Sequence, residues 1–249
     1  GCEPALRDAS ERLAELGDEE GLARGWLAIA SQRVTEARWG EATEAIERVI
    51  DHARAAGDRV IEVRAGPNLA LCAQYGPTPV PEAIRLCEAV LDRSGGDRKA
   101  EAVTLRSLAH LRAMDGDFAG AREAYRRSRA ALEDLGWRFQ AALTSIASGP
   151  VELLAGEPAA AEAELRRDRA ALEALGDHNY VATVAAYLAE AILRQGRSAE
   201  ADEVCRFAEE VADPDDVATQ VALRGVRGRL LALDGAVEAA VERCREAVE

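Results

Sequence analysis

A repeat with a period of about 40 residues constrains the fold of this chain more than any other feature. The four clearest copies place an alanine five residues after a glycine: Gly116 with Ala121, Gly156 with Ala161, Gly196 with Ala201 and Gly235 with Ala240. Looser copies add Ala42 and Ala83, so that successive alanines are separated by 41, 38, 40, 40 and 39 residues. Such a period indicates a stack of similar helical units, each packed on its neighbours, rather than one large core.

The residue types in the repeat fit a helix, a tight turn and a returning helix. Glycine adopts the left-handed conformation that ends many helices, and a small alanine lets the returning helix approach its partner closely. Larger side chains four residues after the alanine lie on the same helix face; they are Ile46, Tyr125 and Leu165. Three cysteines fall at this register or one turn from it and are predicted to fill the core: Cys87, Cys205 and Cys244.

A second motif, in which glycine is followed by aspartate, separates the repeats, as at Gly57 and Asp58. Glycine past a helix end and aspartate at the next N-cap explain this order. The resulting helices are about 15–18 residues long, and their short connections make neighbours antiparallel. The sequence therefore predicts an all-α chain that forms a single repeat domain over 1–249, with helix pairs at 19–56, 59–94, 98–135, 138–175, 178–212 and 215–249. Residues 3–16 are expected to be the second helix of an earlier pair, and the chain is expected to be a fragment of a longer protein.

Composition excludes several functional classes. Aromatic residues make up only 4% of the chain, which disfavours strands. The net charge of −14 opposes direct binding of nucleic acid, which needs clustered Lys and Arg. The longest uncharged run, at 65–81, contains four prolines and is not a membrane span. Five cysteines without a C-x-x-C pair, and no signal peptide, predict a reducing and therefore cytoplasmic location.

The repeat resembles the tetratricopeptide repeat. In the first pair, six residues occupy the signature apolar and small positions of that family: Trp26, Ile29, Ala30, Ala42, Ile46 and Val49. Arg33 departs from the family pattern, which usually has an aromatic residue there. Further matches lie in the fourth and fifth pairs, at Gly149, Gly156, Ala161, Leu188, Ala189, Gly196 and Ala201. The resemblance implies an α-solenoid, a right-handed superhelix of six helix pairs, with a period longer than the standard of about 34 residues.

A narrower resemblance lies in the segments 75–84, 151–162 and 212–217. These are similar to the C-terminal helical repeats of large actinobacterial regulators. In those proteins a nucleotide-cyclase-like or DNA-binding domain and a signal-transduction ATPase module precede the repeats. The resemblance implies a sensor or interaction arm within such a regulator. We expect it to serve as a protein-interaction or autoinhibitory arm, whose partner is a protein or peptide; one candidate is the ATPase or output domain of the same protein. The oligomeric state stays open.

No catalytic motif accompanies the repeats. The sequence lacks a G-x-x-x-x-G-K-[ST] phosphate loop and a G-x-S-x-G elbow, and its three histidines show no metal-ligand spacing. The acidic pairs at 209–210 and 215–216 resemble a helix surface and an N-terminal cap more than an acid–base pair. We therefore expect no enzyme activity, no cofactor and no metal.

Candidate binding residues come from the first helix of each pair, which lines the inner wall of a tetratricopeptide superhelix. The repeat register places eight residues there: Arg24, Asn68, Arg106, His110, Tyr187, Glu190, Arg194 and Arg229. Arginine recognises carboxylate and phosphate groups, so one hypothesis is that this wall binds an acidic peptide or an anionic small molecule. The alternative is that these arginines pair locally with acidic residues one helical turn away.

Two alternatives remain open. Binding of a small effector in the groove would require apolar walls with a few convergent polar groups, whereas a shallow polar groove would favour a protein partner. Pro67 and Pro150 each follow a glycine inside a predicted first helix. They set curvature or act as hinges, or, in the interpretation we favour, simply end those helices early.

Overall fold

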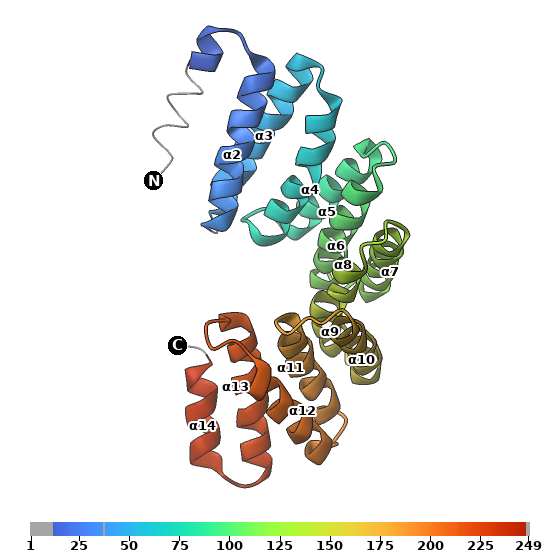
Figure 1. The fold of residues 1–249 in the computed structure, drawn as a ribbon, viewed down its shortest axis with the longest axis vertical. Helices are drawn as coiled ribbons and strands as arrows, with labels where there is room; N and C mark the ends of the chain where they lie inside the picture. Colours follow the sequence, from blue (N-terminus) through green and yellow to red (C-terminus); the bar gives the residue numbers. More distant parts are fainter. Residues whose placement is uncertain (1–11, 37, 248–249) are drawn as a thin grey trace. The chain divides into compact units, whose positions relative to one another are not determined.

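The computed structural model describes residues 12–36 and 38–247. Throughout this part of the chain the structure consists of helices, α2 to α14, joined by short turns (Figure 1). The prediction of an all-α fold of consecutive helix pairs is confirmed. The helix expected at 3–16 lies largely outside the described residues. None of the described helices is both long enough and apolar enough to cross a membrane.

The chain divides by its internal contacts into two compact units, one that ends at Leu135 and one that begins at Gly136. In the first unit each helix packs antiparallel on the next. Its helices are α2 (Glu19–Thr35), α3 (Trp39–Ala56), α4 (Arg59–Tyr75), α5 (Val80–Arg93), α6 (Arg98–Met114) and α7 (Phe118–Asp134). Helix α4 also packs on α6, so first helices of successive pairs are neighbours.

The second unit repeats this arrangement, with one difference in its first pair. Its helices are α8 (Arg138–Ala142), α9 (Thr144–Leu154), α10 (Pro158–Ala174), α11 (Tyr180–Leu193), α12 (Ser198–Val211), α13 (Val217–Leu233) and α14 (Val237–Glu246). The first helix expected within 138–175 is thus two helices, α8 and α9. Helix α11 packs on both α12 and α13, which places two first helices side by side.

The alanine of the repeat is buried in every copy. Ala42, Ala83, Ala121, Ala161 and Ala201 are 0% exposed, and Ala240 is 6% exposed. The larger side chains four residues later, Ile46, Tyr125 and Leu165, are buried as well. The prediction that these positions form the seam between paired helices is confirmed, and the period of the sequence is the period of the core.

The turns at the glycine–aspartate motif have the conformation that the sequence predicts. Gly57 ends α3 with φ of 71°, a left-handed conformation in which a side chain is strained. The Asp58 carboxylate then accepts hydrogen bonds from the backbone N–H of Val60 and of Ile61, each at 3.0 Å. This cap satisfies two of the four N–H groups that a helix start leaves without partners.

The cysteine predictions hold at two positions and fail at one. Cys87 and Cys205 are fully buried core residues, as predicted. Cys244 is exposed, so its assignment to the core is wrong. It lies against Gly228 of α13, but α14 is the last described helix, so no later helix of the described chain covers its outer face. Cys205, one repeat earlier, belongs instead to the core cluster that includes Leu223 of α13.

The glycine–proline steps do not end their helices. Helix α4 continues through Pro67 to Tyr75, and α9 continues through Pro150 to Leu154. The interpretation that the step stops both helices early is therefore wrong. The glycine serves packing instead, because a Cβ on Gly66 would lie 2.8 Å from Cγ1 of Val90 in the facing helix.

The break between α8 and α9 lies at Leu143, well before Pro150. A side chain from the facing helix stabilises it. Asp168 of α10 is 1% exposed, and its Oδ2 accepts a hydrogen bond of 3.0 Å from the backbone N–H of Ser145. Asp168 therefore caps the start of α9 from another helix, in the role that an N-cap residue usually has.

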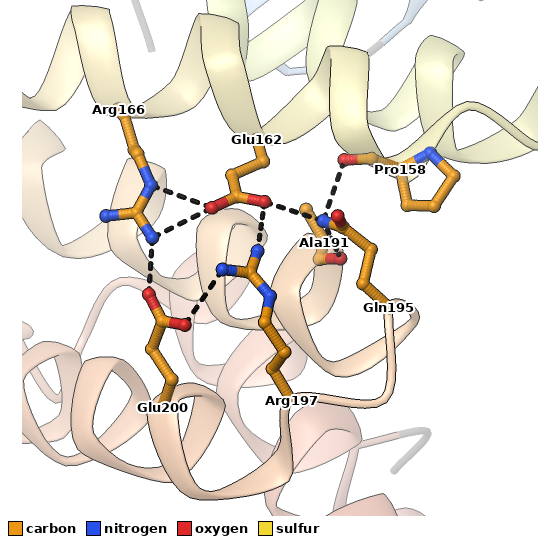
Figure 2. A network of polar contacts seen from close by, with 7 residues as sticks. All are labelled: Pro158, Glu162, Arg166, Ala191, Gln195, Arg197 and Glu200. Atoms are coloured by element: carbon orange, nitrogen blue, oxygen red, sulfur yellow. Dashed lines mark hydrogen bonds and ion pairs between the residues drawn. The ribbon is translucent and has the colours of Figure 1, made fainter.

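A polar network joins α10 to the turn between α11 and α12 (Figure 2). Glu162 accepts hydrogen bonds from Arg166 at 2.8 Å, from Gln195 at 2.7 Å and from Arg197. Glu200 binds the same two arginines, Arg166 at 2.5 Å and Arg197 at 2.9 Å. Burial opposes the charge on Glu162, but the bonds from Arg197, Gln195 and Arg166 outweigh it and lower its pKa to about 2. The network fixes one helix pair to the next.

Candidate functional site

The four candidate residues of the first unit are distributed over α2, α4 and α6. Arg24 is exposed and forms a 2.5 Å ion pair with Glu20, one helical turn earlier. Arg106 is exposed, whereas Asn68 and His110 are half-buried. Burial lowers the pKa of His110, and its Nδ1 lies beneath the surface without a hydrogen-bond partner in the described chain. For Arg24 the structure thus shows the local pairing that the alternative interpretation expects.

The four candidate residues of the second unit line one cavity. This space of about 350 Å³, the α11–α13 cavity, lies between α11 and α13 with α9 at its edge. Tyr187, Glu190, Arg194 and Arg229 all contribute to its wall. Most of the remaining wall is apolar and comes from Pro150, Leu153, Leu154, Ala186, Val221, Ala222, Gly225 and Val226.

The charged residues of the cavity form one cluster around Glu190. This carboxylate is only 7% exposed. Its Oε1 accepts hydrogen bonds from Arg194 Nε at 2.5 Å and from Arg229 Nη1. Arg194 also donates to the backbone oxygen of Leu153 at 2.8 Å, which ties the cluster to α9. Glu190 and Arg194 lie one turn apart on α11, whereas Arg229 belongs to α13 of the next helix pair.

The cluster has more donors than acceptors. Glu190 Oε2 is buried without a hydrogen-bond partner among the described residues, so a single carboxylate oxygen holds both guanidinium groups. Each guanidinium carries five N–H donors, and the side chains of Arg194 and Arg229 are 40% and 53% exposed. The edge of the cavity therefore carries surplus positive charge and unused donors, in a chain whose net charge is −14.

Sequence reasoning missed the apolar wall of this cavity. Gly225 is the clearest omission, because a Cβ built on it would meet nothing within 4 Å. A glycine inside a helix costs about 1 kcal/mol relative to alanine and so calls for a packing or functional reason. The glycine within a predicted helix is visible in the sequence, but the open space beside Gly225 cannot be predicted from the sequence.

The three buried cysteines are the described residues with the most strongly shifted thiol pKa values. Burial raises the pKa of Cys72 to about 11 and those of Cys87 and Cys205 to about 12, which keeps all three protonated near neutral pH. A protonated thiol is a poor nucleophile. Within 12–36 and 38–247, no group of three or more His, Cys, Asp or Glu side chains is placed to hold a metal ion.

Comparison with known proteins addresses the fold. No protein-family model matches the sequence, and no curated protein matches it. A solved tetratricopeptide repeat protein from Parabacteroides merdae ATCC 43184 superimposes with a TM-score of 0.56, covering 98% of this chain and 91% of that one. The fold is that of a tetratricopeptide repeat protein. At 13% sequence identity, this likeness concerns the fold alone.

The Cut9–Hcn1 hetero-tetramer of the APC/C, a second solved structure, is similar at a TM-score of only 0.31. The match covers all of this chain and 60% of the matched chain at 14% sequence identity, and it adds nothing to the fold assignment.

Proposed function

We propose that this chain is a non-catalytic protein-interaction and regulatory scaffold domain of a cytoplasmic bacterial signalling or transcriptional regulator. The tetratricopeptide fold and the resemblance of three segments to actinobacterial regulators support this function. The α11–α13 cavity is the single observation that carries it.

The cavity has the anatomy of an interaction hot spot. Such sites combine an apolar pocket, which excludes water, with charged groups at its edge. Here an apolar side chain of a partner would enter between α11 and α13, and an acidic neighbour would bind Arg194 and Arg229. The partner is a protein or peptide, and an upstream ATPase or output domain of the same protein is one candidate.

Filling the cavity tests this function. Gly225→Leu adds a side chain whose Cβ meets no atom within 4 Å, and Gly225 lines the cavity, so we expect the leucine to fill the site. Gly40→Leu in α3 is the matched control, because the nearest atom to a Cβ there is Pro77 Cγ at 4.0 Å. We expect peptides selected from a displayed library on the wild type to bind Gly40→Leu equally and Gly225→Leu at least about tenfold more weakly, the effect of losing a hot-spot contact. Equal binding to both variants would refute the proposal.

Binding of a small effector is a second candidate function, favoured by the cavity itself. Its 350 Å³ lie within the range of about 300–1,000 Å³ that is typical of ligand pockets. Its wall is apolar with a few convergent polar groups, which is the pattern that such a site requires. A thermal-shift screen against metabolites tests it, because a ligand that binds only the folded state raises the melting temperature.

A further inference from the structure

The apolar wall of the α11–α13 cavity determines which kind of chain or ring a ligand can place there. Ala186 and Gly225 are small residues that keep space open between their helices, and Val221 and Val226 offer aliphatic surface. Burial of an aliphatic or aromatic group there gains about 25 cal/mol per Å² of apolar surface removed from water. A ligand with an apolar body therefore gains binding energy that a strongly hydrated sugar or nucleotide would not.

The charged edge of the same cavity selects a head group. The cluster consists of two arginines and one carboxylate, so it carries one net positive charge. A cation would meet that surplus charge, and a neutral group would leave the unused guanidinium donors to water. A carboxylate matches the planar fork of arginine and accepts two parallel hydrogen bonds.

The acidic surface of the chain does not prevent this recognition. At physiological ionic strength the Debye length is about 8 Å, so exposed charges beyond that distance are largely screened. Arg194 and Arg229 act at contact distance, beside an apolar wall where water is partly excluded and charge-assisted hydrogen bonds are stronger. Local charge therefore decides which head group binds.

We infer that the α11–α13 cavity binds a small amphipathic carboxylic acid as its carboxylate. The apolar chain or ring lies between α11 and α13, and the carboxylate binds the exposed edges of Arg194 and Arg229. The inference rests on the second candidate function and names its ligand class. Glu190 orients both guanidinium groups, because one buried oxygen binds the two of them.

Three probes with one chain and different head groups test the inference: octanoate, octanamide and octylamine, titrated calorimetrically below their micellar concentrations. We expect octanoate to bind at least about tenfold more tightly than either of the others, the value of a hydrogen bond to a charged group. Arg229→Gln should remove this preference while leaving Glu190 paired with Arg194. Arg24→Gln, at an exposed arginine of the first unit, should change nothing.

Gly225→Leu should weaken the binding of octanoate by at least about tenfold, because it fills the apolar space. Arg194→Gln is a second test of the head-group site if Arg229→Gln proves unstable by circular dichroism. The inference is overturned if octylamine or octanamide binds as tightly as octanoate, if no probe binds, or if Gly225→Leu binds octanoate normally. Peptides that still require an open cavity would then support the interaction function independently of this ligand class.

Discussion

The two units contain the same glycine–proline step in a first helix, and the helices around it differ. In the first unit α4 is continuous from Arg59 to Tyr75 with Pro67 inside it. In the second unit the corresponding segment is divided at Leu143 into α8 and α9, with Pro150 well within α9. Proline removes one backbone donor in both cases, so proline alone does not explain the difference.

The facing helix supplies an explanation. The repeat register aligns the two pairs, because Val90 of α5 and Asp168 of α10 each lie seven residues after the repeat alanine, at Ala83 and Ala161. At this position the first unit has Val90, which packs against Gly66, and the second unit has Asp168, which binds the backbone of Ser145. A carboxylate accepts the backbone N–H exposed by a helix break, as Asp168 does for Ser145. The valine side chain has no hydrogen-bond acceptor. The residue opposite a helix therefore decides whether a break is stabilised.

The largest expected effect comes from removing that acceptor. We expect Asp168→Ala to destabilise the second unit by about 2–4 kcal/mol, because it leaves the Ser145 N–H buried without its partner and empties a fully buried position. Urea unfolding measures the loss, and amide hydrogen exchange at Ser145 locates it.

Arg93→Ala is a control on the facing helix of the first unit. Arg93 is exposed, and exposed substitutions usually change stability by less than about 0.5 kcal/mol. If both variants lose the same stability, or if Ser145 exchanges at the wild-type rate in Asp168→Ala, the capping role of Asp168 is disproved.

Replacing Gly66 or Gly149 with alanine tests the comparison between the two units further. The expected change in stability is smaller than that for Asp168→Ala. In Gly66→Ala the new Cβ would lie 2.8 Å from Val90 Cγ1, on a short, stiff side chain. We expect a net loss of about 1–2 kcal/mol after the gain in helix propensity. In Gly149→Ala the contacts with Leu165 are 3.1–3.2 Å and involve a longer side chain, so we expect a change within about 1 kcal/mol. Thermal unfolding of both variants would contradict this if Gly149→Ala were the less stable.

An effect of similar size depends on pH and compares a partly buried carboxylate with an exposed one. The pKa of Glu162 is lowered from 4.5 to about 2, so its ionised form stabilises the fold above the unfolded pKa, and that contribution is lost as pH falls from 4.5 towards 2. We expect Glu162→Gln to cost about 1–2 kcal/mol at pH 7 and the gap to close near pH 2.

Glu123→Gln is the control for this titration. Glu123 pairs with Arg126 at 2.6 Å on the exposed face of α7, and that hydrogen bond lowers its pKa. Solvent screens such a pair, so Glu123→Gln should follow the wild-type stability curve from pH 2 to 7. A constant difference between Glu162→Gln and the wild type over this range would show that the charge on Glu162 is unimportant.

Candidate binding residues could be predicted in part. Helical register selected Tyr187, Glu190, Arg194 and Arg229, and these line one cavity. The register did not reveal that Arg229 binds Glu190 from the neighbouring pair, because that contact joins residues 39 positions apart. The register also did not reveal the open space beside Gly225, because that space depends on which side chains of α11 line the same cavity.

The sequence by itself determined the period, the buried alanine seam and the turns, because each depends on local backbone preferences and on which side chains are small enough for two helices to meet. Tertiary structure alone decided the break at Leu143, the exposure of Cys244 and the position of the cavity. These depend on side chains from other helices: Asp168 accepts a backbone N–H, no later described helix covers the outer face of α14, and the small residues Ala186 and Gly225 both line the space between α11 and α13. A repeat pattern describes each pair by itself, whereas contacts between pairs differ from one copy to the next.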